Sequence, residues 1–201
     1  MMKRARVHSP QLMARVAGLL YALIFVFGVS GAAAATPTRM TLTSACDIGV
    51  ALILFALLQA VNRNLAIIAA AFRLISVAVT AATSLIYFGV LGWFNAAHSA
   101  AAFDTGYTIA LVPFGVQCLL FGYLIFKSGC FPRLLGMLYA LAGLAYMVCL
   151  WPALGQRLFF PYIVVPAVLG EGSLTLWLLF VGINVPRWEQ LARRNAQPVS
   201  R

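Results

Sequence analysis

Charged side chains are scarce in this sequence, and acidic ones are nearly missing. Of its 201 residues, 9% are charged, and only four are Asp or Glu. Since a soluble domain carries about 25% charged residues, the composition excludes a cytosolic enzyme, a secreted disulfide scaffold and a disordered tail. What remains is an apolar chain, 63% hydrophobic with a mean hydropathy of +0.96, that is suited to a lipid bilayer.

Signatures of metal, nucleotide and disulfide sites are also missing. The two histidines, His8 and His98, lie on opposite sides of the predicted membrane, and no EF-hand, P-loop or GxGxxG motif occurs. We therefore expect no cofactor and no metal. The four cysteines lack CxxC spacing and are interpreted as small packing residues: Cys46, Cys118, Cys130 and Cys149.

Long apolar stretches dominate the chain. A bilayer core of about 30 Å needs roughly 20 mostly apolar residues per helix, and six stretches qualify. They lie at about 16–35, 42–61, 65–88, 107–126, 134–151 and 161–183. The sequence therefore predicts an all-α, polytopic bundle of six transmembrane helices at 16–185, preceded by a basic tail at 1–15 and followed by a basic tail at 186–201, both in the cytoplasm.

The net charge of +10 would suggest nucleic acid in a soluble protein, but the positions of the cations indicate a membrane. With the N-terminus in the cytoplasm, eleven Lys and Arg residues fall on the side of both tails and two, Arg39 and Arg157, on the other. This bias predicts a membrane protein with both of its ends in the cytoplasm, N-in and C-in. Its partners are then the anionic headgroups of the lipid bilayer and no nucleic acid, with a homo-oligomer or a membrane partner left open.

Each end of the chain allows a second interpretation. The first span also resembles a signal peptide, because a basic start and an apolar stretch precede the small residues at 31–35 (GAAAA). Cleavage would leave five spans, but the long basic start favours a retained helix. The segment after Pro186 has features of an interfacial helix, with Trp188 at headgroup level and Glu189 four residues before Arg193. A solvated basic end is the simpler interpretation.

Three ionisable residues fall within predicted spans: Asp47, Arg73 and Glu171. Each costs roughly 2.5 to 3.5 kcal/mol at the membrane centre unless it is paired or hydrated. Because an arginine side chain is long, Arg73 can reach toward Glu171 and, with some helix tilt, toward Asp47. We expect one charge-compensated cluster made by the second, third and sixth spans.

The third span adds a polar stripe to this centre. Its members fall within about 100° of arc at helical spacing, and they include Arg73 together with Ser76, Thr80, Thr83, Ser84 and Tyr87. Lipid contact would leave these side chains in hydrocarbon, so the stripe faces protein or a water-filled cavity. In the sixth span, Pro166 predicts a kink near Glu171.

Three functions fit this polar centre. It can bind or move a small or amphipathic molecule, which requires the stripe to line a cavity. It can instead be structural or accessory, with the charges only fixing helix packing. An intramembrane hydrolase or transferase is the third option, since residues 28–31 (GVSG) place Ser30 in a nucleophile-like motif with His98 and Asp104 nearby in the predicted outer loop. No span contains a histidine base.

Several segments form a series that runs through most of the chain. They are 14–21 (ARVAGLLY), 61–66 (VNRNLA), 72–74 (FRL), 118–129 (CLLFGYLIFKSG), 132–136 (PRLLG), 170–171 (GE) and 176–179 (LWLL). In this order, with Asp47, they resemble the bacterial membrane family known as domain of unknown function 4386, from Ala14 to about Asn184. The resemblance implies an integral protein of the bacterial cytoplasmic (inner) membrane with several helices, and it supplies no reaction or catalytic residue. The outer loop 89–106 is shorter than this resemblance leads us to expect.

Overall fold

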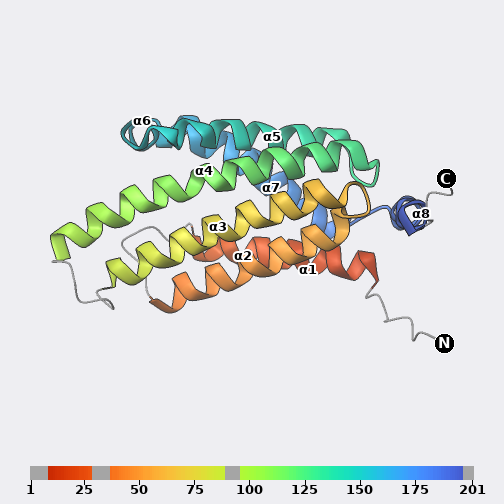
Figure 1. Cartoon of the computed structure of the whole chain (residues 1–201), viewed down its shortest axis with the longest axis horizontal. Coiled ribbons are helices and arrows are strands. Elements are labelled where there is room, and N and C mark those ends of the chain that lie inside the picture. Colours follow the sequence, from red (N-terminus) through yellow and green to blue (C-terminus); the bar gives the residue numbers. More distant parts are fainter. Residues whose placement is uncertain (1–8, 29–36, 89–95, 197–201) are drawn as a thin grey trace.

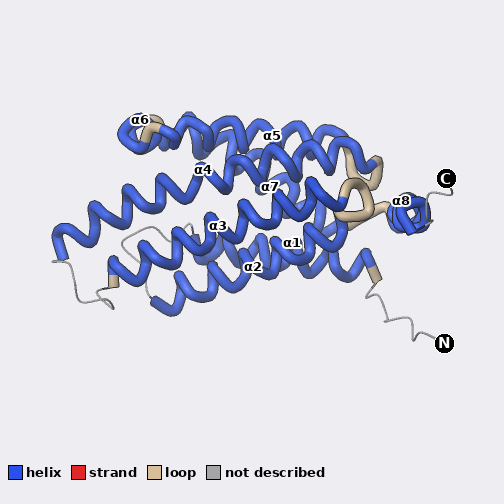
Figure 2. Tube along the Cα trace, in the orientation of Figure 1, coloured by secondary structure: helices blue, strands red, loops and turns tan. Residues whose placement is uncertain are grey.

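The computed structural model describes residues 9–28, 37–88 and 96–196, and every regular element in them is a helix (Figures 1 and 2). Six helices of these segments are long and apolar enough to cross a membrane, which confirms the predicted all-α bundle. The elements in chain order are α1 (Pro10–Gly28), α2 (Pro37–Leu58), α3 (Arg63–Tyr87), α4 (Ala96–Ser128), α5 (Arg133–Tyr146), the 3₁₀ turn η2 (Met147–Leu150), α6 (Pro152–Arg157), the π turn η3 (Phe159–Ile163), α7 (Val164–Phe180) and α8 (Val185–Ala196).

Several boundaries differ from those predicted. The first helix begins at Pro10 and not at Val16, because Ser9 accepts a hydrogen bond from the backbone of Leu12 and caps it. The fourth helix begins at Ala96, so most of the predicted outer loop is helical. Alanine has the highest helix propensity, and the alanines of residues 96–102 extend a helix whose first turns are too polar to be recognised by hydropathy.

The start of the sixth membrane-compatible segment also differs from the expectation. The predicted break at 152–157 forms the short helix α6, which has Pro152 in its first turn. Pro166 lies in the first turn of α7, where proline is tolerated. The backbone departs from helical geometry earlier, at Phe160, which has φ −115° and ψ 131°. The change of direction therefore precedes the position that the sequence indicated.

The six long helices pack in a closed ring. Each of α1 to α5 packs against the next helix in the chain. The ring is completed by α7, which packs against both α5 and α1. Figure 1 shows that α1 begins and α7 ends at the same end of the bundle, with α6 and the start of α4 at the other end. Apolar side chains cover much of the outer surface, as lipid contact requires; examples are Leu19, Ile75, Leu141 and Leu176.

Glycines allow the closest helix contacts. A Cβ atom on Gly122 of α4 would lie 2.8 Å from the carbonyl oxygen of Gly136 on α5, and one on Gly115 would lie 2.9 Å from that of Gly143. The backbones of these two helices therefore touch, as expected for helices that associate in lipid through small residues.

The last helix, α8, lies across the bundle and is seen end-on in Figure 1. Trp188 Nε1 donates a hydrogen bond to the carbonyl oxygen of Leu57 at 2.8 Å, and Asn195 Nδ2 donates to that of Ala60 at 2.7 Å. Glu189 and Arg193 form the expected pair at 3.5 Å. The C-terminal segment is therefore a helix that covers the end of α2, which a solvated tail would not do.

Candidate functional site

A fully buried arginine lies at the centre of the bundle. Arg73, on α3, has no exposed surface, and its Nη2 atom donates a hydrogen bond to Oδ1 of Asp47 on α2 at 2.5 Å. The Asp47 side chain is 20% exposed. The ion pair therefore connects the buried core with an accessible space. A buried charge pair is stable only where further groups satisfy its remaining donors, and the neighbouring helices supply them.

Two tyrosines and a glutamine complete the surroundings of Arg73. Its Nη1 atom donates to the hydroxyl of Tyr21 at 2.7 Å and lies 3.4 Å from both the Gln117 Oε1 atom and the Tyr139 hydroxyl. The two tyrosine hydroxyls are 2.6 Å apart. The rings of Tyr21 and Phe114 lie against the guanidinium, with centroids 4.9 and 5.1 Å from its carbon.

We refer to Asp47, Arg73, Tyr21, Gln117 and Tyr139 as the Arg73 network. Its members come from α1, α2, α3, α4 and α5, so one side chain ties five helices together. Gln117 Nε2 also donates to the Tyr139 hydroxyl at 2.9 Å. Within the described segments, Nε is the atom of this guanidinium that has no hydrogen-bond partner.

Glu171, on α7, stands apart from this network. The residue is 8% exposed, and its Oε1 atom accepts a hydrogen bond from the Tyr146 hydroxyl at 2.5 Å. We expected Arg73 to reach Glu171, but the structure pairs Arg73 with Asp47, and no ion pair among the described residues includes Glu171. The two Nη atoms of Arg73 are instead hydrogen-bonded to the other members of the Arg73 network.

The polar stripe of α3 is divided between protein and cavity. Ser76 donates to the carbonyl oxygen of Ala110 on α4 at 2.8 Å, and the Tyr87 ring packs against that of Phe103 with centroids 5.0 Å apart. Ser76 and Thr80 also line the cavity described below. The remaining hydroxyls donate to carbonyls of their own helix, as serine and threonine commonly do in membrane helices: Thr80, Thr83 and Ser84.

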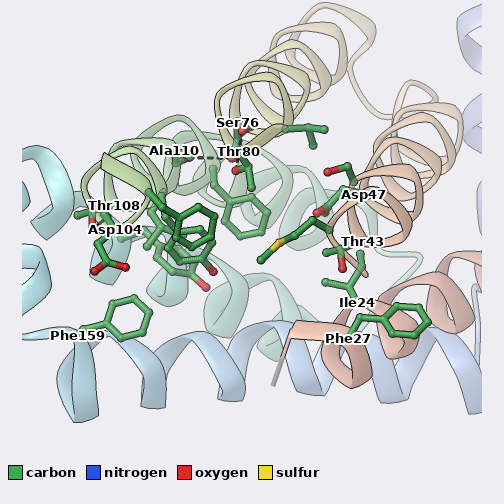
Figure 3. A pocket seen from close by; sticks show the side chains of 18 of the residues that line it. Ile24, Phe27, Thr43, Asp47, Ser76, Thr80, Asp104, Thr108, Ala110 and Phe159 are labelled. Carbon is green, nitrogen blue, oxygen red and sulfur yellow. Dashed lines mark hydrogen bonds between the residues drawn. The ribbon is translucent and has the colours of Figure 1, made fainter. Parts of the chain in front are cut away.

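A cavity of about 600 Å³ lies inside the ring of helices (Figure 3). Asp47, Tyr146 and Glu171 line its inner part, and Arg39 and Asp104 line it toward the end at which α2 and α4 begin. Figure 3 shows polar side chains of α2 and of α4 on different sides of this space. Much of the wall is apolar or aromatic: Ile24, Phe27, Phe103, Tyr107, Leu111, Phe114 and Phe159.

Sequence reasoning missed the uncharged members of the site. Tyr21, Tyr139 and Tyr146 were passed over because tyrosine is common in membrane helices, where it counts as apolar in a composition. Gln117 offered a clearer indication, since an amide in the middle of the fourth span requires a partner as Arg73 does. All four are buried and hydrogen-bonded to the charged residues or to each other.

The residues considered for catalysis or for metal binding lie partly outside the described segments. Ser30, His8 and the side chain of His98 lie outside the described residues, whereas Asp104 lines the cavity. In the part of the chain that the structure describes, no three His, Cys, Asp or Glu residues are placed to hold a metal ion. All four cysteines lie buried as free thiols.

A ring of six membrane-compatible helices around a cavity with carboxylates in an otherwise largely apolar wall defines a polytopic membrane protein. The chain belongs to the family described as Domain of unknown function (DUF4386), whose model matches residues 38–182. It is also 28% identical to an uncharacterised protein of Archaeoglobus fulgidus over 136 residues, which are 68% of this chain and 76% of that protein. No solved structure matches. The matched region contains Asp47, Arg73 and Glu171.

Proposed function

We propose that this protein binds a small amphipathic molecule in the cavity inside the helix ring. The cavity supports the proposal because it connects the end at which α2 and α4 begin with the carboxylates of Asp47 and Glu171. Small-molecule sites have volumes of about 300 to 1,000 Å³, with mostly apolar walls and a few polar groups that fix orientation. A cavity of about 600 Å³ with aromatic walls has these properties.

The entrance and its side of the membrane are part of the proposal. The charge bias of the sequence predicts both tails in the cytoplasm, and α8 lies at the opposite end from α6 and the start of α4. With that orientation, the cavity opens away from the cytoplasm of a bacterial inner membrane. Asp47, Tyr146 and Glu171 are the deepest of the described lining residues. The ligand would therefore enter and leave on one side of the membrane.

The Arg73 network has a structural role in this proposal. Arg73 is fully buried and is not among the residues that line the cavity. Its hydrogen bonds to Tyr21 and Asp47 hold the helices that form the wall. Packing is therefore assigned to the Arg73 network, of which Asp47 also lines the cavity, and ligand binding is assigned to the other lining residues.

Labelling of single cysteines tests whether the cavity is open to water. We expect Thr80→Cys and Ser44→Cys, in a background without the four native cysteines, to react with a membrane-impermeant maleimide added from outside. Both residues line the cavity. Ala78→Cys is the matched control, because Ala78 lies on α3 with an outward-facing, exposed position, where a thiol in lipid does not ionise and does not react.

The outcomes of this labelling are distinct. Reaction at both cavity positions, with protection at Ala78→Cys, is the expected result. Protection at all three positions in correctly inserted protein would show a dry helix seam and overturn the proposed binding function.

A further inference from the structure

The acidic residues of this chain are concentrated at the cavity. The protein has a net charge of +10 and only four acidic residues. Three of them, Asp47, Asp104 and Glu171, line the cavity, and the fourth, Glu189, lies on α8 at the other end of the bundle. Arg39 is the basic residue among the described lining residues. A strongly cationic protein thus has more acidic than basic side chains among the described residues that line its cavity.

The two deep carboxylates are not equivalent. Asp47 is neutralised by Arg73 at 2.5 Å. Glu171 accepts a hydrogen bond from the neutral hydroxyl of Tyr146, and no described Lys, Arg or His nitrogen pairs with it. An ionised carboxylate in the middle of a membrane protein is costly without a counter-charge. Glu171 is thus a buried acceptor that faces the cavity and forms no direct ion pair with any residue that the structure describes.

The cavity walls add a second feature that suits a positive ligand. Aromatic rings attract cations over their faces within about 6 Å of the ring centroid, and Phe114 and Tyr146 line the deep part of the cavity near Glu171. The molecule already uses this interaction, since the Phe114 ring lies 5.1 Å from the guanidinium carbon of Arg73. Aromatic faces and an unpaired carboxylate together favour a cation with an apolar body.

We propose that the cavity is selective for an organic cation, in which an apolar body fills the aromatic part and one positive group approaches the Glu171 carboxylate. This inference rests on the proposed binding function and names the class of its ligand. Glu171 supplies the counter-charge, and Asp47 stays paired with Arg73. A hydrophobic anion of the same size meets Glu171 and Asp104 and is rejected by like charge.

Two hydrophobic ions of matched shape and opposite charge test the selectivity. Equilibrium dialysis of the full-length protein in detergent micelles, with empty micelles as background, measures saturable binding of tetraphenylphosphonium and of tetraphenylborate. We expect saturable binding of the cation and only background partitioning of the anion. This comparison needs no variant, so it does not depend on the folding of any substitution.

Two variants then assign the effect to one carboxylate. Glu171→Gln should lower the affinity for tetraphenylphosphonium by at least about tenfold, because the ligand charge loses its buried partner. Glu189→Gln, which removes the same charge on exposed α8, should bind as the unaltered protein does. Glu171→Asp keeps the charge and should keep the preference for the cation.

The possible failures separate the two proposals. Saturable binding of both ions with equal affinity, unchanged by Glu171→Gln, would overturn the cation selectivity and leave the binding function intact. Absence of saturable binding for either ion, together with protected cysteines at Thr80 and Ser44, would overturn both.

Discussion

The polar centre of this protein contains two regions that look alike in sequence and differ in structure. Arg73 and Asp47 form an ion pair that is hydrogen-bonded to tyrosines of other helices. Glu171 has a hydrogen bond from Tyr146 and faces a cavity. An ionisable residue in a membrane helix can therefore have either a structural or a binding role. Its neighbours decide which, because they determine whether its charge is paired within the protein.

Their energetic roles follow from this difference. A buried ion pair is a poor source of stability relative to apolar residues, but removal of one partner leaves an uncompensated charge and is strongly destabilising. A carboxylate that faces an accessible cavity retains contact with water or ligand, and its replacement by a neutral isostere costs little. Measurements of the free energy of unfolding can therefore distinguish the two regions. Three substitutions are expected to lower it by different amounts.

Asp47→Ala should have the largest effect. It leaves the Arg73 charge buried without a partner, and we expect a loss of about 3 to 5 kcal/mol in the free energy of unfolding. Denaturant titration in detergent micelles measures this loss. The double variant Asp47→Ala with Arg73→Leu should recover part of it, and Asp104→Ala, which removes an exposed carboxylate of the cavity, is the control. Equal stability of Asp47→Ala and the unaltered protein would show that the ion pair does not stabilise the fold.

Tyr139→Phe should have an intermediate effect. The substitution removes the hydroxyl that Tyr21 and Gln117 contact, at 2.6 and 2.9 Å. A buried group that loses its partner costs about 1 to 3 kcal/mol, and the same titration measures it. Tyr123→Phe is the matched control because Tyr123 is an exposed residue of α4. A change no larger than that of the control would mean that the tyrosines only fill space around Arg73.

Glu171→Gln should have the smallest effect on stability, below about 1 kcal/mol, since the amide oxygen of glutamine can still accept the hydrogen bond from Tyr146. The variant thus separates stability from the expected loss of cation binding. If unfolding measurements instead gave a loss as large as that of Asp47→Ala, Glu171 would belong to the structural core, and the distinction between the two regions would fail.

Much of the architecture could be predicted from the sequence because length and hydropathy alone define a helix that can cross a membrane. All six long helices were expected, and so was the position of Asp47, Arg73 and Glu171 within them. The errors lie at the ends. The start of α4 has the alanines of a helix but the polarity of a loop, and hydropathy responds only to the polarity.

The pairing within the site could not be predicted in the same way. Depth along a helix follows from about 1.5 Å per residue, but the rotation of each helix about its axis depends on packing with every other helix. Arg73 selects Asp47 because Tyr21 and Phe114 fix its guanidinium beside α2. The cavity is likewise a property of six helices together, and no single span contains it.

The closure of the helix ring also constrains how the protein is made. Gln11, at the start of α1, donates to the carbonyl oxygen of Val181 at 2.7 Å and accepts from the backbone of Ile183 at 3.0 Å, just beyond the end of α7. Since a chain emerges from the ribosome N-terminus first, α1 is made before α7, and these bonds form only after α7 has been made. Until then the Gly18 face of α1, which packs against the backbone of Leu178 and Leu179, stays open to lipid. A nascent chain that ends before α7 therefore cannot close the helix ring, and it lacks the helix that carries Glu171.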